Sequence, residues 1–336
     1  MKVAIAGAGM SGAYLFRRLK DQGFGDVDLY DVKKNNACGI RPCAWGFAPT
    51  SETRRLISKV ADPGQFEKQR STQITVDGVK MRSDILILDK PSLIRELVKG
   101  EVIKEGPIDL NAYDRVIDAT GVNRAYLPPI EDDLIADTVQ YRIKSEEPLG
   151  LWFNTSSIGY EWCFPLGDDE YHMGFGNLRS DVKSYRPATA KGEDMVGKQI
   201  RCKCHSSVRL TTPFYSQPFV SNGKVVGVGE SIGAVAPIVA DGNLYAMQTA
   251  EMLVENWDEL DSYSEKVLNR YDWMRKERSA LEKMMAGKMP SLSEALTMKR
   301  HSNMVGVEMN TMHVLKLFRK MARSGNDDMD RPIDRG

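Results

Sequence analysis

Residues 2–12 read KVAIAGAGMSG, from Lys2 to Gly12, and this stretch decides the fold. A short apolar run, too brief for a helix, leads directly into glycines with the spacing G-x-G-x-x-G. Gly7 permits a tight turn, Gly9 leaves room for a pyrophosphate group, and Gly12 lets the following helix pack closely. The stretch therefore predicts a buried strand, a glycine-rich turn and a helix whose first N–H groups bind phosphate.

The residues after this turn complete a nucleotide-binding unit. The predicted helix runs from about Met10 to Gln22 and ends at Gly23 in a left-handed conformation. Val27 to Tyr30 forms the second strand, and Asp31 follows where a carboxylate accepts the hydrogen bonds of an adenosine ribose. We predict a dinucleotide site in an α/β fold with a Rossmann-type parallel sheet. An acid at this position disfavours a 2′-phosphate.

The composition is that of an ordinary globular chain. Its 336 residues are 42% hydrophobic and 27% charged, which is enough for two domains around a substantial core. Lysine plus arginine and aspartate plus glutamate each number 46, so no overall charge favours nucleic acid. The five cysteines suggest no disulfide framework, and Cys202-Lys203-Cys204-His205 has no common zinc spacing, so no metal site is predicted. We recognise no signal peptide or spanning segment and expect a cytoplasmic protein.

The middle of the chain has the period of β-strands. Thr50 or Ser51 is expected to cap a helix that reaches about Val60, and Asp77-Gly78 predicts a tight hairpin. From Asp137 to Arg179 apolar residues alternate with polar ones, which is typical of an antiparallel sheet. A period of two places three aromatic residues on one face, which is either core or the wall of a ligand pocket. These residues are Tyr160, Trp162 and Phe164.

Two later segments are also rich in glycine. Asp114 to Gly121 reads as a buried strand that runs into the small residues Ala119-Thr120-Gly121. Gly223 to Glu230 reads as another buried strand, and Asp241-Gly242-Asn243 then opens a helix through Glu255. Because such turns carry few side chains, the backbone can approach a ligand closely there.

The C-terminal part is expected to be helical. Met304 to Met321 reads as one amphipathic helix with Val307, Met312, Leu315 and Phe318 on its apolar face. Such a helix docks on the body of the protein or contacts a membrane surface or a lipid substrate. We expect a discontinuous nucleotide-binding domain (1–60, 85–125 and 220–260), an antiparallel-sheet substrate domain (61–84 and 126–219), a helical region (261–325) and a disordered tail (326–336).

Together, the three glycine-rich segments resemble the FAD-dependent group that includes p-hydroxybenzoate hydroxylase. Within that group, three further segments are similar to the geranylgeranyl reductase family. Tyr160-x-Trp162-x-Phe164-Pro165-x-Gly167 resembles its aromatic sheet motif, Cys38-Gly39 its Cys-Gly loop, and Ile87-Leu88-Asp89-Lys90 its Leu-Asp-Arg segment. The resemblance covers most of the chain and implies a Rossmann-type FAD-binding domain with an antiparallel-sheet substrate domain and C-terminal helices.

The resemblance also implies a set of contacts to FAD. Helix N–H groups at Asn243 would face the flavin pyrimidine and stabilise negative charge on the reduced ring. Glu230 replaces the family's usual aspartate, and Asp241-Gly242-Asn243 replaces a run of glycines. The expected FAD-binding residues are Gly7, Ala8, Gly9, Met10, Ser11, Gly12, Asp31, Ala119, Thr120, Gly121, Gly229, Glu230, Pro237, Gly242 and Asn243.

The activity that the resemblance implies is reduction of carbon–carbon double bonds in a prenyl chain by hydride from reduced flavin. Electrons would come from an external donor, which is a reduced nicotinamide, ferredoxin or a deazaflavin. Cys38, Cys43 and Tyr160 are candidates for the proton donor or a substrate contact, and Arg41 for a substrate headgroup. Tyr160, Trp162 and Phe164 are candidates for the substrate wall.

Three alternatives stay open. A flavin-dependent monooxygenase or halogenase-like enzyme would react reduced flavin with oxygen. A non-enzymatic FAD-binding electron-relay protein is the second alternative, and peripheral contact with a membrane fits it. A dehydrogenase that uses only NAD would leave the late glycine-rich strand without a role.

Overall fold

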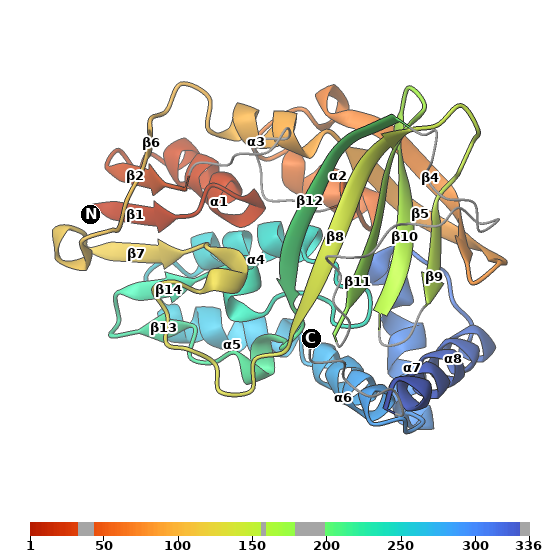
Figure 1. Ribbon diagram of the computed structural model, residues 1–336. Helices are drawn as coiled ribbons and strands as arrows, with labels where there is room; N and C mark the ends of the chain where they lie inside the picture. Colours follow the sequence, from red (N-terminus) through yellow and green to blue (C-terminus); the bar gives the residue numbers. More distant parts are fainter. Residues whose placement is uncertain (33–43, 156–158, 179–198, 330–336) are drawn as a thin grey trace, which may run out of the picture.

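The computed structural model describes residues 1–32, 44–155, 159–178 and 199–329, with residues 324–329 described by their helical backbone alone. Within these ranges the chain forms two sheets with helices packed around them (Figure 1). One sheet has six strands and the other has eight. No helix in the described ranges is both long enough and apolar enough to cross a membrane.

The six-stranded sheet is mainly parallel and is built around the N-terminal strand. Strand β1 (Val3–Ala6) lies between β2 (Val27–Tyr30) and β7 (Arg115–Asp118), and both neighbours run parallel to it. Beyond them lie β6 (Ile103–Lys104), β14 (Val225–Gly227) and the antiparallel edge strand β13 (Val220–Ser221). All residues of β1 and β7 are buried, as expected for strands covered on both faces. The predicted Rossmann-type sheet is confirmed.

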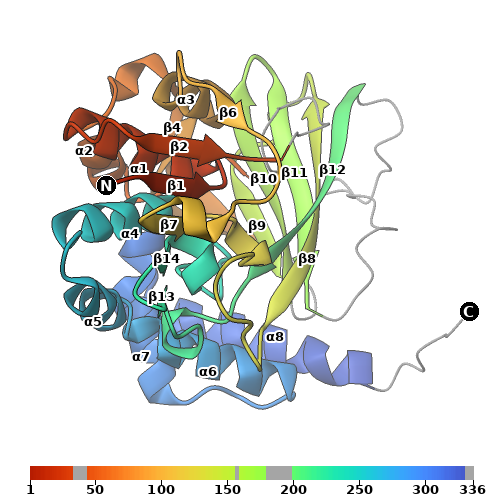
Figure 2. The same cartoon turned by 90° about the vertical axis from the view of Figure 1, so that its left-hand side faces the viewer.

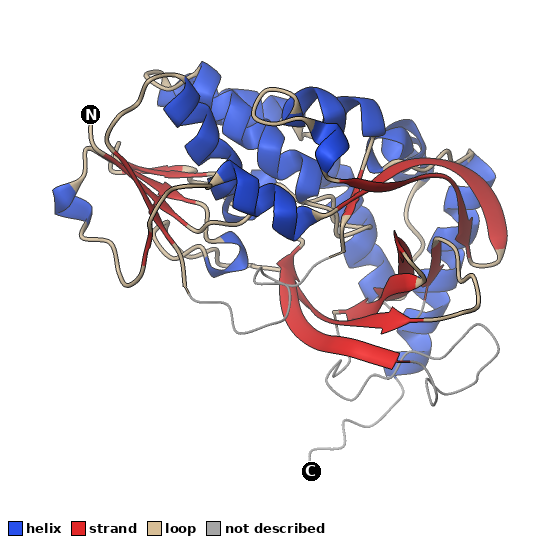
Figure 3. Cartoon of the chain, turned by 90° about the horizontal axis from the view of Figure 1, so that it is seen from above, coloured by secondary structure: helices blue, strands red, loops and turns tan. Residues whose placement is uncertain are grey.

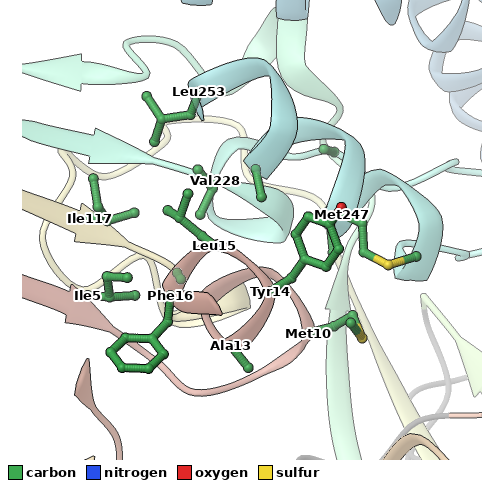
Figure 4. Close-up of a cluster of buried hydrophobic side chains, with 14 of the residues drawn as sticks. Ile5, Met10, Ala13, Tyr14, Leu15, Phe16, Ile117, Val228, Met247 and Leu253 are labelled. Atoms are coloured by element: carbon green, nitrogen blue, oxygen red, sulfur yellow. The ribbon is translucent and has the colours of Figure 1, made fainter. Parts of the chain in front are cut away.

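Helix α1 (Met10–Asp21) packs on this sheet, and three further helices pack on α1 or on one another. Helix α1 starts at the glycine turn, and α4 (Asn243–Glu255) packs beside it from far along the chain. α2 (Thr50–Ile57) contacts α4, and α3 (Lys90–Leu97) contacts α1. Figure 4 shows the resulting core, in which Leu15 and Leu253 of the helices gather with Ile117 of a strand and with Val228. Gly23 follows α1 with a φ of +86°, as predicted.

The eight-stranded sheet is mainly antiparallel and stands beside the first (Figure 2). The hairpin predicted at Asp77-Gly78 is confirmed, with φ values of +50° and +80°. The antiparallel sheet predicted within 137–179 is confirmed for the described strands. Among the described pairs of the larger sheet, only β4 (Glu67–Val76) and β9 (Trp152–Thr155) are parallel. The strand order is β12 (Gln199–Arg209), β8 (Ile135–Lys144), β11 (Glu170–Asn177), β10 (Gly159–Gly167), β9 (Trp152–Thr155), β4 (Glu67–Val76), β5 (Val79–Leu88) and β3 (Gly46–Phe47).

Helix α2 begins differently from the prediction. Thr50 is its first residue rather than its cap, and Pro49 at the N-cap position makes no side-chain hydrogen bond. The carboxylate of Asp84 on β5 accepts the N–H of Thr50 at 3.1 Å instead. A carboxylate distant in sequence therefore satisfies this helix end, and no local pattern predicts such a partner.

The C-terminal part of the chain is helical, as predicted, but the helices have other limits than expected. They are α5 (Leu260–Arg270), α6 (Trp273–Met285), α7 (Leu292–His301) and α8 (Thr311–Met329), and only α8, which begins later, overlaps the single helix expected over 304–321. The chain turns at Gly306, whose φ is +73°, so Val307 belongs to a connection and Met312 is 61% exposed. α8 also extends into the range predicted as a tail; residues 330–336 lie outside the described ones.

The two sheets and the C-terminal helices surround a common space. Seen from above, the parallel strands and the larger sheet form two separate groups of strands, with helices along one side of both (Figure 3). α6, α7 and α8 pack against one another through a core that includes Leu281, Met284, Met298 and Phe318. Strands β3–β5 of the second sheet lie in sequence between β2 and β7 of the first. The domain limits given above stay a prediction.

Candidate functional site

A cavity of about 850 Å³ extends from the glycine turn to the larger sheet and the C-terminal helices. Its polar end is formed by the turn after β1, by Asp31 after β2 and by the turn after β7. Its apolar end is formed by aromatic residues of β9 and β10 and by residues of α6, α7 and α8. The predicted nucleotide site and the predicted aromatic wall therefore belong to one continuous space.

The glycine turn has the geometry that the spacing predicts. Gly7 has a φ of +102°, and a Cβ there would lie 2.8 Å from the carbonyl carbon of Ala119. A Cβ on Gly12 would lie 1.8 Å from the carbonyl oxygen of Gly7, so only glycine lets α1 approach the turn this closely. A Cβ on Gly9 would meet no atom within 4 Å. Gly9 thus faces open space at the N-terminus of α1, where a phosphate group fits.

The second turn is held by a buried carboxylate that the sequence analysis missed. Asp118 is 0% exposed and accepts the N–H groups of Thr120, Tyr126 and Leu127 at 3.0, 2.8 and 3.1 Å. It also accepts the hydroxyl of Thr120 at 2.7 Å. An acid directly after the apolar strand residues Val116 and Ile117 was the available signal. These bonds fix the turn that lines the cavity beside the glycine turn.

The third glycine-rich segment, at Gly229, packs against the first at Ser11. Gly229 has a φ of +67°, and a Cβ there would lie 2.9 Å from the side chain of Ser11. The neighbouring Glu230 accepts the N–H of Arg209 at 2.9 Å, and Arg209 also binds Asp133 at 2.8 Å. The predicted FAD-binding residues Gly12 and Gly229 therefore lie against protein atoms, whereas Glu230 lies in the cavity wall.

Polar groups converge at the start of α4. Asn243 accepts a hydrogen bond from Lys90 at 2.6 Å and donates one to the carbonyl of Gly46 at 2.9 Å. Its own N–H donates to the carboxylate of Asp241 at 3.1 Å. Burial raises the pKa of Asp241 to about 6, against the lowering effects of the Asn243 N–H and of Lys90. A cation, an amide and a titratable acid thus meet where Gly242 starts the helix.

The aromatic face predicted from strand alternation is a wall of the cavity. Phe153, Tyr160, Trp162 and Phe164 line it, with ring centroids 5.3 to 5.7 Å apart in contacting pairs. Glycines make room for the rings, since a Cβ on Gly174 would lie 2.5 Å from the ring of Trp162. This wall could hold an apolar chain at the sheet end of the cavity.

Tyr160 connects this wall with the loop before α4. Its hydroxyl donates to the carbonyl of Val239, and burial, followed by the charge of Asp241, raises the pKa of that hydroxyl. The proton of the hydroxyl is therefore already engaged in a hydrogen bond. This geometry favours substrate contact over proton donation for Tyr160.

Most of the predicted site residues come together in the cavity wall. Cys38, Arg41 and Cys43 lie outside the described residues, so their roles stay predictions. Lys90 and the residues of α6 and α7, which are Leu281 and Met298, were not predicted as cavity residues. Leu317 and Met321 of α8 also line the cavity, which agrees with the alternative that the C-terminal amphipathic helix contacts a substrate. The predicted residues that line the cavity are Gly7, Ala8, Gly9, Met10, Ser11, Asp31, Ala119, Thr120, Gly121, Tyr160, Trp162, Phe164, Glu230, Pro237, Gly242 and Asn243.

Comparison with known proteins gives two sequence relatives. No family model matches the chain. An uncharacterized protein of Methanocaldococcus jannaschii is 25% identical over 332 residues, which cover 84% of this chain and 90% of that protein. The digeranylgeranylglycerophospholipid reductase of Methanocella arvoryzae is 29% identical over 174 residues, which cover 48% of this chain and 44% of the reductase.

Solved structures share the whole fold. A geranylgeranyl bacteriochlorophyll reductase-like protein from Thermoplasma acidophilum superposes with a TM-score of 0.69 at 16% identity, over 98% of both chains. The flavin-dependent halogenase CmlS superposes with a TM-score of 0.60 at 17% identity, over 96% of this chain and 71% of the halogenase. The FAD complex of HpxO from Klebsiella pneumoniae superposes with a TM-score of 0.60 at 16% identity, over 97% of this chain and 99% of HpxO. This chain therefore has the fold of the FAD-dependent oxidoreductases. The resemblance to geranylgeranyl reductases found in the sequence is confirmed.

Proposed function

We propose that this chain is an FAD-dependent oxidoreductase that reduces carbon–carbon double bonds in the prenyl chain of a geranylgeranyl-type lipid. The observation that supports this proposal most is a single cavity, which joins a nucleotide-binding turn to an end lined by aromatic and aliphatic residues. Partial sequence similarity to a digeranylgeranylglycerophospholipid reductase supports the lipid class. The fold, shared with an FAD complex, supports the cofactor.

The residues at the polar end fit FAD. The backbone of Gly7 to Ser11 and the N-terminus of α1 would hold the pyrophosphate, because Gly9 leaves open space there. Asp31 would accept hydrogen bonds from the adenosine ribose. Asn243 and Lys90 supply positive potential at the start of α4, which stabilises negative charge on a nearby ring. When bound and reduced, FAD supplies hydride to the substrate.

The residues at the apolar end would position the substrate. An isolated double bond is a poor electrophile, so it has to be held close to the hydride donor in a site that excludes water. Trp162 and Phe164 provide rigid apolar surface from the sheet, and Leu281, Met298 and Met321 line the cavity from the helices. The unbranched methionine side chains adapt to a long prenyl chain. The electron donor would be external, as a reduced nicotinamide, ferredoxin or a deazaflavin.

The helices at this end also support the proposed peripheral contact with a membrane. Leu292 and Leu296 on α7 are 61% and 49% exposed, and they lie one helical turn apart. On α8, Met312 is exposed, and the exposed cations Lys316 and Arg319 follow it. Apolar and cationic residues side by side suit the surface of an anionic bilayer. A lipid substrate would then be taken from that surface.

A flavin-dependent monooxygenase or halogenase-like enzyme is the second candidate, because the halogenase CmlS has the same fold. It differs from the first candidate in its product. A reductase adds two hydrogens to each double bond, whereas a monooxygenase inserts oxygen and a halogenase inserts halide. A non-enzymatic electron-relay protein would change no lipid at all.

The test is anaerobic single turnover with purified protein reconstituted with FAD. We expect a yellow protein that dithionite bleaches and that geranylgeraniol in detergent micelles reoxidises, with a mass gain of two hydrogens for each reduced FAD consumed. Trp162→Ala should slow reoxidation without changing bleaching. Phe214→Ala, at an exposed aromatic residue after β12, is the matched control and should leave both unchanged. Protein that stays colourless with FAD, or bleached protein that no prenyl lipid reoxidises, would contradict the proposal.

A further inference from the structure

Asp241 lies where the two ends of the cavity meet. It lines the cavity directly before α4, next to the predicted cofactor residues Gly242 and Asn243. The loop that leads to it is bound by Tyr160 of the aromatic wall, through the carbonyl of Val239. A carboxyl group at this position is therefore close to both the expected cofactor and the expected substrate chain.

The backbone and the side chain of Asp241 are both held in place. The carbonyl of Asp241 accepts the N–H of Ala236 at 2.9 Å, which closes the loop 236–241 on itself. One carboxyl oxygen accepts the N–H of Asn243 at 3.1 Å. Within the described part of the chain, no second hydrogen bond to this carboxyl group is found. Such an arrangement fixes the group while one oxygen stays available to a ligand.

The groups around Asp241 act on its protonation in opposite directions. Lys90 on α3 and the Asn243 N–H favour the carboxylate, whereas burial favours the acid. Tyr160 on β10 and Tyr245 on α4 are the neighbouring hydroxyls, and burial raises the pKa of each. The charge of Glu277 on α6 also acts on Tyr245; burial raises the pKa of the Glu277 carboxyl group to about 8, so it is mainly protonated at neutral pH. Burial prevails at Asp241, and its pKa of about 6 lies close to neutral pH, as suits a general acid.

We infer that Asp241 is the proton donor of the reduction, an inference that rests on the proposed function. The carboxylic acid of Asp241 would give its proton to one carbon of the double bond, while the other carbon receives the hydride that reduced flavin would supply. The π bond would break and its electron pair would form the new C–H bond to that proton, and the hydride would carry the two electrons of the reduction. The Asp241 carboxylate then takes a proton from solvent.

The first experiment compares Asp241→Asn with wild type in anaerobic single turnover with geranylgeraniol. Asparagine keeps an oxygen that can accept the Asn243 N–H, so FAD binding and bleaching should be unchanged. We expect reoxidation about 10²- to 10⁴-fold slower, the range that general acid catalysis contributes. The matched control is Asp168→Asn in the exposed turn between β10 and β11, which should react at the wild-type rate.

The second experiment follows protonation directly. The wild-type rate should fall tenfold per pH unit above about pH 6, Asp241→Asn should lose this dependence, and Asp241→Glu should partly restore it. In FAD-free protein labelled with ¹³C-aspartate, one carboxyl signal should titrate near pH 6 and be missing in Asp241→Asn. This second readout does not depend on turnover.

Failure of the inference differs from failure of the proposed function. If wild type reduces geranylgeraniol and Asp241→Asn does so equally fast, Asp241 is not the donor, although the protein is a reductase. A titration near pH 4 would likewise contradict the inference. If reduced wild-type protein leaves every prenyl lipid unchanged, the proposed function is wrong, and the role of Asp241 falls with it.

Discussion

Gly9 and Gly12 belong to one motif, yet substituting them should have different consequences for stability. In Gly12→Ala the new Cβ would lie 1.8 Å from the carbonyl oxygen of Gly7, so α1 has to shift away from the turn. Such overpacking costs about 3 kcal/mol. The unfolding entropy is about 2.1 cal/mol/K per residue, so for 336 residues the melting temperature should fall by about 4 °C. FAD binding should weaken because the turn itself is displaced.

Gly9→Val should leave the fold intact and abolish FAD retention. Nothing lies within 4 Å of the new Cβ, and the φ of −76° suits any residue, so the melting temperature should change by about 1 °C. Free FAD at 100 times its dissociation constant stabilises wild type by about 2.7 kcal/mol, or about 4 °C. This shift should vanish in Gly9→Val, because the valine fills the expected phosphate position.

Differential scanning fluorimetry with and without FAD measures both effects. If Gly12→Ala melts at the wild-type temperature, α1 does not approach the turn as closely as the structure shows. If Gly9→Val still shows the full shift with FAD, the cofactor binds elsewhere.

Three further predictions concern charge and surface. Burial opposes ionisation of Glu294, but hydrogen bonds, the strongest from Lys283, lower the pKa of Glu294 to about 2. Glu294→Gln should therefore be less stable than wild type at pH 7. Thermal melts should show this difference in stability shrinking as pH falls from about 4.5 towards 2. Burial raises the pKa of Glu277 to about 8. The stability of Glu277→Gln should equal that of wild type near pH 4.5, and the variant should become the more stable protein as pH rises through 8. Equal melting temperatures at pH 9 would contradict this. Replacing Leu292 and Leu296 by serine should reduce co-sedimentation with anionic vesicles and leave FAD binding unchanged; undiminished sedimentation would show that α7 is not the contact.

Several features of the fold were predictable because their causes are local. The glycine spacing after β1 fixes a turn through backbone sterics alone, and the structure has this turn with a φ of +102° at Gly7. Asp77-Gly78 predicted its hairpin for the same reason. Strand alternation placed Tyr160, Trp162 and Phe164 on one face without knowledge of the neighbouring strands.

Other parts of the site depend on partners that are distant in sequence. Lys90 reaches Asn243 across 153 positions. Asp84 replaces the predicted cap of α2, and Gly306 breaks the helix that amphipathic spacing predicted as continuous. Each of these features arises when separate segments pack, and a local pattern contains no information about the partner.

The sequence by itself determined the nucleotide turn, the hairpin and the aromatic face, since hard-sphere limits on the backbone and a period of two act within a few residues. Only the tertiary structure decided that the turn and the aromatic face border one cavity, and that α6 to α8 close its apolar end. It also decided that the carboxyl group of Asp241 is held between the two ends. The physical reason is that burial and convergence of polar groups depend on how the sheets and helices pack, which the order of residues along one segment does not contain.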